Sequence, residues 1–227
     1  MRAVTLVAAV LGALLVAVPA LAAPPVQRTA RLERTVHVYA RPGAAPTREL
    51  VSAQRPLTGQ RTILPVTAEA RGPSGAKWVR VLLPGRPNGH QGWIRQSDVG
   101  LGRTPWRVLI DTARRRLTVF KKGRAMHSFL AVVGKPSTPT PRGSFFVEEA
   151  LILPSHSPGW PYAFALSARS TVYQEFDGGP GQIAMHGTYA IGGTPGTAVS
   201  HGCIRLDAST LSWMVARFGP GTPVTIR

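Results

Sequence analysis

Glycine and proline interrupt this chain so often that few of its stretches are long enough to form an extended helix. The 227 residues include 24 glycines and 21 prolines, and the apolar runs between them are short. Turn-forming residues between short apolar runs are typical of strands joined by tight turns. We therefore expect a mainly β fold, and the length allows one or two domains, each with its own core.

The first half of the chain predicts a small β-barrel over residues 35–100, because short strand-like runs alternate there with turn residues and no helical periodicity is present. The closing half of bacterial Src-homology-3-like domains resembles one part of this region, namely Lys77–Leu83, a turn and then Gly92–Ile94. The resemblance implies that this domain would bind wall peptides. Residues 24–34 are polar and begin with proline, so we predict a flexible tether there. Residues 100–105 predict a linker into a second domain.

From Trp106 onward the pattern is that of further strands and one helix. Polar turns that contain glycine join the strand-like runs, which favours antiparallel pairing. Asp207 is a candidate N-cap for the helix, and Gly219 is a candidate end. The apolar residues between them have helical spacing: Leu211, Met214, Val215 and Phe218.

The chain has a single cysteine, Cys203, and therefore cannot form a disulfide within itself. Its fold must depend on its hydrophobic cores. His201 lies two residues before it, Arg205 two residues after it, and His186 seventeen residues before it. A thiol attacks as the thiolate, which a nearby base or cation favours. This grouping predicts a cysteine nucleophile.

Two histidines are candidates for the base. On a strand, His201 and Cys203 would share a face with their side chains side by side, a poor arrangement for a hydrogen bond. His186 comes from a different segment and can meet the thiol directly, so we predict His186 as the base and His201 as a residue that shapes the site. Zinc binding by these three residues is the alternative, but their spacing matches no known zinc motif and a fourth ligand is not evident. We predict no metal and no organic cofactor.

The stretch from His186 to Leu206, HGTYAIGGTPGTAVSHGCIRL, resembles the signature of the L,D-transpeptidase (YkuD-type) catalytic domain. The Pro/Thr loop at 134–145 and the ending at 221–226 are similar to the same family, in the family's order, so the resemblance covers residues 105–227. The interval from His186 to Ser200 is slightly shorter than is usual in the family, and Arg205 stands where many members carry Asn. The resemblance implies a β-sandwich-like catalytic domain.

The resemblance also implies acyl transfer on peptidoglycan stem peptides. Cys203 would form a thioester with release of D-Ala, and an amine of a neighbouring stem or of a protein would resolve it. The alternatives are an L,D-carboxypeptidase, in which water resolves the thioester, a wall-binding protein with an inactive site, and a basic polymer-binding protein. Five neighbours are candidates for substrate or oxyanion contacts: Gly187, Thr188, Ser200, Gly202 and Arg205.

The first 23 residues have the pattern of a secretory signal peptide. A positive start at Arg2 precedes an almost continuous apolar run from Ala3 to Val18, and small residues follow. We expect export to the periplasm or cell wall, with membrane contact only through this segment, and an uncleaved anchor is the alternative. With a net charge of +17, an exported chain is expected to meet anionic wall polymer rather than nucleic acid. The sequence holds no signal for an oligomeric state.

Overall fold

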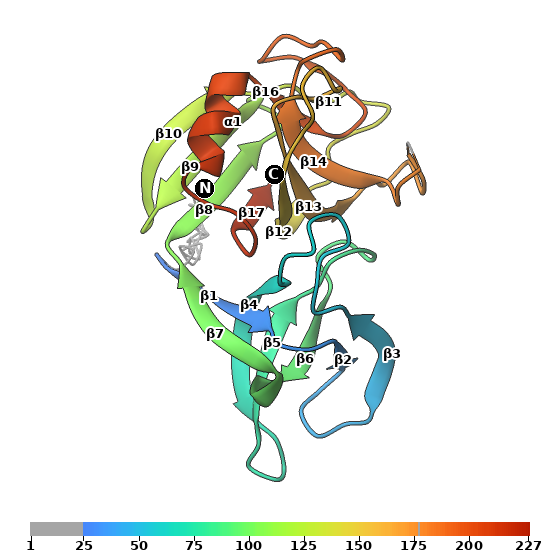
Figure 1. Ribbon diagram of the computed structural model, residues 1–227, viewed down its shortest axis with the longest axis vertical. Coiled ribbons are helices and arrows are strands. Elements are labelled where there is room, and N and C mark those ends of the chain that lie inside the picture. Colours follow the sequence, from blue (N-terminus) through green and yellow to red (C-terminus); the bar gives the residue numbers. More distant parts are fainter. Residues whose placement is uncertain (1–24, 177) are drawn as a thin grey trace, which may run out of the picture.

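A computed structural model describes residues 25–176 and 178–227, and over these residues the protein consists mostly of strands. Two large sheets are present, the lower formed by the first half of the chain and the upper by the second half (Figure 1). The expectation of a mainly β fold is confirmed. The predicted signal peptide at 1–23 lies outside the described residues. No helix in the described part of the chain is long and apolar enough to cross a membrane.

The first sheet has seven strands in the order β3-β2-β6-β5-β4-β1-β7, and all its neighbours are antiparallel. Its core consists of aliphatic side chains such as Leu64, Val79 and Ile94, which are fully buried. Trp78 is also buried and packs edge-on against Tyr39, so it fills this unit instead of lining an open groove. The elements are β1 (Gln27–Leu32), β2 (Val36–Tyr39), β3 (Pro46–Val51), β4 (Ile63–Arg71), β5 (Lys77–Leu82), β6 (Gln91–Arg95), the short 3-10 helix η1 (Gln96–Asp98) and β7 (Val99–Thr104).

The predictions of a tether at 24–34 and a linker at 100–105 are wrong, because both segments contribute strands to this sheet. Strand β1 pairs with β7 from Gln27 opposite Thr104 to Leu32 opposite Val99. These strands were not evident in the sequence, because arginines lie between the buried residues of β1 and because β7 contains two glycines. One of them fits a close approach of the strands, since a Cβ on Gly102 would lie only 3.0 Å from the Thr29 hydroxyl on β1.

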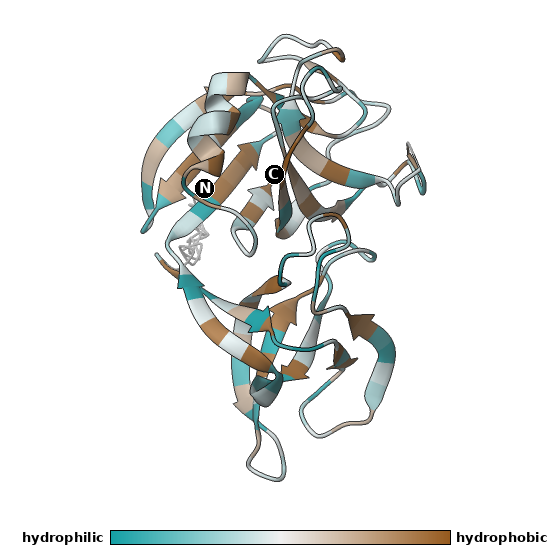
Figure 2. Cartoon of the chain, in the orientation of Figure 1, coloured by the Kyte–Doolittle hydropathy of each residue, from teal (hydrophilic) through white to brown (hydrophobic). Residues whose placement is uncertain are grey.

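The second sheet has eight strands in the order β10-β9-β8-β17-β12-β13-β14-β16. Most pairs are antiparallel, but β17 runs parallel to β8 and β14 runs parallel to β16. Apolar residues gather in the strands, and the loops are mostly pale or teal (Figure 2). The strands are β8 (Trp106–Asp111), β9 (Arg116–Lys121), β10 (Arg124–Leu130), β12 (Gly143–Ile152), β13 (Tyr162–Arg169), β14 (Gln182–Gly187), β16 (Ile204–Leu206) and β17 (Pro223–Ile226), with β11 (Val133–Gly134) and β15 (Ala198–Ser200) forming a separate parallel pair.

The predicted helix is present as α1 (Ala208–Val215). The carboxylate of Asp207 caps it by accepting a hydrogen bond from the Thr210 N–H at 2.7 Å. Leu211 and Met214 are fully buried against the second sheet. The helix ends before Phe218, which the spacing had included, although the Phe218 side chain still reaches the same core.

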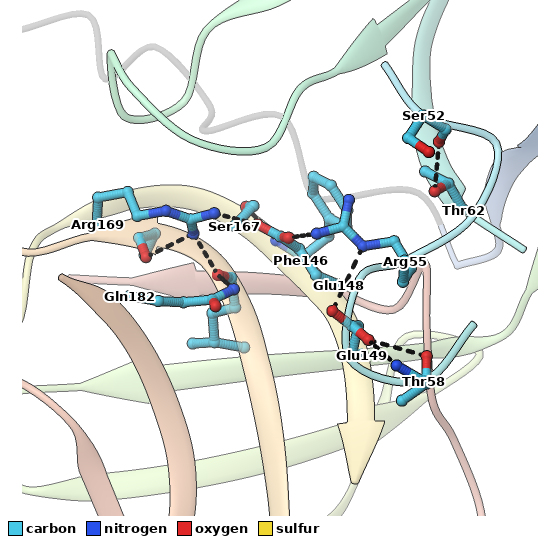
Figure 3. Close-up of polar contacts among 12 residues, drawn as sticks. Ser52, Arg55, Thr58, Thr62, Phe146, Glu148, Glu149, Ser167, Arg169 and Gln182 are labelled. Atoms are coloured by element: carbon cyan, nitrogen blue, oxygen red, sulfur yellow. Dashed lines mark hydrogen bonds and ion pairs between the residues drawn. The ribbon is translucent and has the colours of Figure 1, made fainter. Parts of the chain in front are cut away.

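Strand β12 connects the two units, because its alternate side chains enter different cores. Phe145 packs in the core of the second sheet, and Phe146 packs in the core of the first. Beyond a bulge between Val147 and Glu149, two buried carboxylates also face the first unit. Glu148 forms ion pairs with Arg55 and with Arg169, the latter at 3.1 Å, and Glu149 accepts hydrogen bonds from Thr58 at 2.8 and 2.9 Å (Figure 3).

Candidate active site

The parallel pairing of β14 with β16 brings the two halves of the predicted site together. Met185 lies opposite Ile204 and His186 lies opposite Arg205. Met185 and Ile204 are fully buried in the core, so the alternate residues face the other way. His186 and Arg205 therefore lie on the outer face, and Cys203 directly precedes β16 at the same edge.

A cavity of about 490 Å³ opens over this face. Four of the residues predicted from the sequence line it: His186, His201, Cys203 and Arg205. The rest of the lining is mostly apolar and comes from Leu153, Pro158, Ala163, Phe176 and Ile191. The structure therefore joins a thiol, two imidazoles and a guanidinium in one cavity that is large enough for a peptide segment.

Cys203 lies in a bend between β15 and β16, not on a continuous strand as the sequence suggested. Gly202 forms the bend with a φ of +122°, which side-chain-bearing residues rarely adopt. The Ser200 hydroxyl closes it by donating to the Cys203 carbonyl oxygen at 2.6 Å and accepting from the Gly202 N–H at 3.1 Å. Two expectations are corrected here. Ser200 is fully buried and shapes the bend instead of meeting substrate, and the Gly202 N–H is already bonded, so it is not an oxyanion donor.

The Pro/Thr loop holds this bend from behind. The Thr138 hydroxyl donates to the Ser200 carbonyl oxygen at 3.2 Å, and the Thr140 hydroxyl donates to the Gly202 carbonyl oxygen at 2.8 Å. Both threonines are buried. The sequence pointed to this loop through the family resemblance, but it did not assign the threonines a role; the structure gives them the role of fixing the main chain around the thiol.

The hydrogen bond made by His186 determines which of its nitrogens can act as a base. Nδ1 lies 2.9 Å from the carbonyl oxygen of Gly187, and a carbonyl can only accept. Nδ1 therefore carries the proton, and in the neutral ring Nε2 has the free lone pair. The Gly187 carbonyl oxygen thus orients the ring, in addition to the substrate or oxyanion contact for which Gly187 was a candidate. Thr188 has a different place, because its carbonyl oxygen accepts from the Gly192 N–H at 2.9 Å and begins the next loop.

Burial dominates the electrostatics of the site. It raises the pKa of the Cys203 thiol, although the Ala184 backbone N–H and the charge of Arg205 oppose that shift. Burial also lowers the pKa of His186; the Gly187 hydrogen bond opposes this shift and Arg205 adds to it. For the resting site, burial thus outweighs the nearby cation, which by itself favours the thiolate. At neutral pH the pair consists of a neutral thiol and a neutral imidazole.

Arg205 anchors a loop as well as lining the cavity. Its Nη1 donates to the carbonyl oxygens of Ile191 and Gly192, at 2.8 and 3.1 Å. Its Nε is buried and has no hydrogen-bond partner among the described residues. The guanidinium thus holds the loop after β14 over the cavity, a role that the sequence did not indicate. Among the described residues, no three His, Cys, Asp or Glu side chains gather as a metal site would require.

The direction of the Cys203 shift predicts how alkylation should depend on pH. We expect the rate with iodoacetamide to keep rising above about pH 8.5, the usual pKa of a free thiol, because only the thiolate reacts. At pH 7 the rate should be lower than that of glutathione. Mass spectrometry of the alkylated protein across a pH series gives the rate; a plateau reached by pH 7 would contradict the raised pKa.

Residues 105–226 match the family description "YkuD: L,D-transpeptidase catalytic domain". That match covers more than half of the chain, and the chain belongs to this family. L,D-transpeptidase 1 of Mycobacterium tuberculosis is 28% identical over 117 residues, which are 48% of this chain and 45% of that protein. The putative L,D-transpeptidase YkuD of Bacillus subtilis is 30% identical over 123 residues, which are 54% of this chain and 66% of that protein. The chain thus matches about half to two thirds of the length of these relatives.

Solved structures of L,D-transpeptidases are also similar to this chain. L,D-transpeptidase 3 from M. tuberculosis is 17% identical with a TM-score of 0.44, over 67% of this chain and 91% of that chain. The L,D-transpeptidase from Mycobacterium smegmatis is 18% identical with a TM-score of 0.41, over 71% of this chain and 93% of that chain.

Proposed function

We propose that this protein is a cysteine-dependent L,D-transpeptidase, which cross-links peptidoglycan stem peptides or attaches a protein to them through a thioester on Cys203. The observation that carries the proposal is the geometry of one cavity. It is lined by the only thiol of the chain and by an imidazole whose Nδ1–H is held by Gly187, so that Nε2 is the nitrogen able to accept the thiol proton.

The first half-reaction uses the neutral pair directly. Nε2 of His186 accepts the proton of Cys203 as the sulfur attacks the peptide carbonyl carbon of the stem. The resulting oxyanion needs backbone donors, and the N–H of Cys203 is the candidate, since that of Gly202 is bonded to Ser200. When the carbon–nitrogen bond breaks, the amine of D-Ala takes the proton from the His186 imidazolium and leaves, and the acyl group remains on sulfur.

The second half-reaction reverses these transfers with a different amine. The acceptor amine attacks the thioester, His186 removes its proton, and Cys203 leaves as a thiolate that regains the proton from the imidazolium. A lowered His186 pKa keeps the ring neutral before each attack, and a raised Cys203 pKa keeps the proton on sulfur until substrate arrives. The two pKa shifts therefore suit a transfer of the thiol proton to His186 during the attack, and they disfavour a thiolate–imidazolium pair before substrate binds.

The mass of the products tests the proposal. The purified chain is incubated with a disaccharide tetrapeptide, and the products are separated and weighed. A dimer lighter by one D-Ala supports transpeptidation. Monomer that has lost D-Ala, without dimer, would assign an L,D-carboxypeptidase to the same site. Unchanged substrate with folded protein would sink the proposal and favour a wall-binding role without catalysis.

Substitution of each histidine separates their roles. His186→Ala should slow D-Ala release by about 10²- to 10⁴-fold, the usual contribution of a general base. His201→Ala should slow it by less than about tenfold, because His201 lies at the exposed side of the cavity. Single-turnover kinetics with the tetrapeptide measures both. A larger loss in His201→Ala than in His186→Ala would reverse the assignment.

The setting of the reaction is also a proposal. The signal-like residues 1–23 support export to the periplasm or cell wall, and the net charge of +17 supports contact with anionic wall polymer. The resemblance of Lys77–Leu83 and Gly92–Ile94 to Src-homology-3-like domains supports a wall-peptide-binding role for the first sheet.

A further inference from the structure

The wall of the cavity beside His201 is formed by the connection between β13 and β14. We name this connection the 170–181 loop; the structure describes it at 170–176 and 178–181. The rings of Tyr173 and Phe176 have centroids 5.5 Å apart, and they lie 6.1 and 5.9 Å from the His201 ring. Phe176 also lines the cavity together with Cys203. The position of the loop therefore sets the shape of the cavity on the His201 side.

The bonds within the loop give it a shape but do not fix its orientation. The Ser170 N–H donates to the Gly181 carbonyl oxygen at 2.7 Å, which closes the base of the loop. Phe176 and Gly179 exchange two backbone hydrogen bonds at 2.9 and 3.0 Å, which close its tip. These contacts are internal, so the angle at which Tyr173 and Phe176 meet His201 depends on what holds the loop from outside.

Arg86 supplies such an outside contact from the first sheet, where it lies in the connection between β5 and β6. Its Nη1 donates to the Pro180 carbonyl oxygen, and its Nη2 donates to those of Ser170 and Tyr173, each at 2.9 Å. A planar guanidinium presents five donors in a fixed fork and can hold three carbonyls in a defined geometry, whereas the three donors of an ammonium share one rotatable nitrogen. One side chain therefore joins both ends of the loop to the residue that packs on His201.

Two neighbouring residues place Arg86 and the loop against each other. The Asn88 side chain pairs with the main chain of Arg169, the last residue of β13: its Nδ2 donates to the carbonyl oxygen at 2.7 Å, and its Oδ1 accepts from the N–H at 2.8 Å. Gly181 leaves space for the main chain of the loop, since a Cβ there would collide with the Tyr173 carbonyl oxygen, the same oxygen that accepts from Arg86.

We propose that Arg86 is a positioning residue for the catalytic cavity, which orients Phe176 and His201 through the 170–181 loop. The first sheet then forms part of the support of the cavity, in addition to any binding that it performs itself. The expected effect of Arg86 on KM rests on the proposed function, whereas its expected effect on the order of the 170–181 loop does not.

The test compares Arg86→Ala with Arg48→Ala, which removes an exposed arginine from the edge strand β3 of the same sheet. In Arg86→Ala we expect the amides of the 170–181 loop to exchange with deuterium roughly three- to tenfold faster, as the loss of these hydrogen bonds implies. The KM for a stem tetrapeptide should rise by a similar factor, with kcat changed less than twofold. Arg86→Lys should fall between Arg86→Ala and the unmodified chain, and Arg48→Ala should match the unmodified chain.

Gly181→Ala disturbs the same loop without removing a charge, at a φ of +64° where a side chain is strained. It should produce the same faster exchange and higher KM. Loop exchange in Arg86→Ala equal to that in Arg48→Ala would overturn the proposal. If the unmodified chain releases no D-Ala, the proposed function fails, and the exchange rates alone still decide whether Arg86 holds the loop.

Discussion

Cys203→Ala should abolish D-Ala release from a stem tetrapeptide, with a loss of about 10³-fold or more. The sulfur is the proposed nucleophile, and no other cysteine is present to replace it. Intact-protein mass spectrometry after an acid quench should show the unmodified chain heavier by the acyl group of the stem, and the variant unchanged. The half-buried position of Cys203 and the small difference in volume mean that Cys203→Ala should still fold.

Cys203→Ser is the matched control, since it replaces the thiol with a hydroxyl of similar shape in the same bend. It should also lose activity, because a serine hydroxyl is a far weaker nucleophile beside a neutral imidazole. Full D-Ala release by either variant, with unchanged thermal unfolding, would show that the reaction does not pass through this side chain.

Arg55→Ala should destabilise the protein by about 3 kcal/mol, the lower end of the usual cost of breaking a buried ion pair, because Glu148 keeps its second partner, Arg169. Glu148 is fully buried between Arg55 and Arg169, and the Arg55 side chain is only 10% exposed. The Arg169 side chain is only 9% exposed, and this burial lowers its pKa to about 10. Urea unfolding followed by circular dichroism measures the loss.

The double variant Arg55→Met with Glu148→Gln is the informative control, because it removes the two charges and keeps most of the volume. It should recover a large part of the stability that Arg55→Ala loses. Arg48→Ala, at an exposed site, should stay within about 0.5 kcal/mol of the unmodified chain. A loss below about 1 kcal/mol in Arg55→Ala would mean that water or rearranged side chains satisfy Glu148.

Local patterns in the sequence were enough to predict most of the second sheet and the four polar residues that line the cavity. The helix could be located because Asp207 caps it and Leu211 and Met214 recur at helical spacing. Strands β1 and β7 could not be predicted, because arginine and glycine give no strand signal and these strands exist through their pairing with each other.

The sequence could predict that Cys203 and the two histidines share a site, but not which of their side chains are charged. A nearby base and cation favour the thiolate, yet the sequence could not show that burial outweighs the cation. Ser200 was a candidate for substrate or oxyanion contact, and only the structure shows its hydroxyl turned inward to close the bend.

The contacts between the two units were not predictable at all. Arg55, Arg86 and Glu148 look like ordinary surface charges in the sequence, since nothing local shows that another unit covers them. Their partners lie far away along the chain, as with Arg86 and Pro180. Contacts of this kind depend on how the whole chain folds, and periodicity carries no information about them.

Strand β12 has a consequence for how this protein can be divided or recombined. Because Phe146 fills the core of the first unit and Thr58 donates two hydrogen bonds to the buried Glu149, the second unit carries surfaces that its own partner covers. A chimera that joins this second unit to a foreign first unit would uncover a phenylalanine and would leave Glu149 without its Thr58 donors, and both changes disfavour a stable fold. The two units are therefore best engineered as one block, and exchange of the first alone requires redesign of β12.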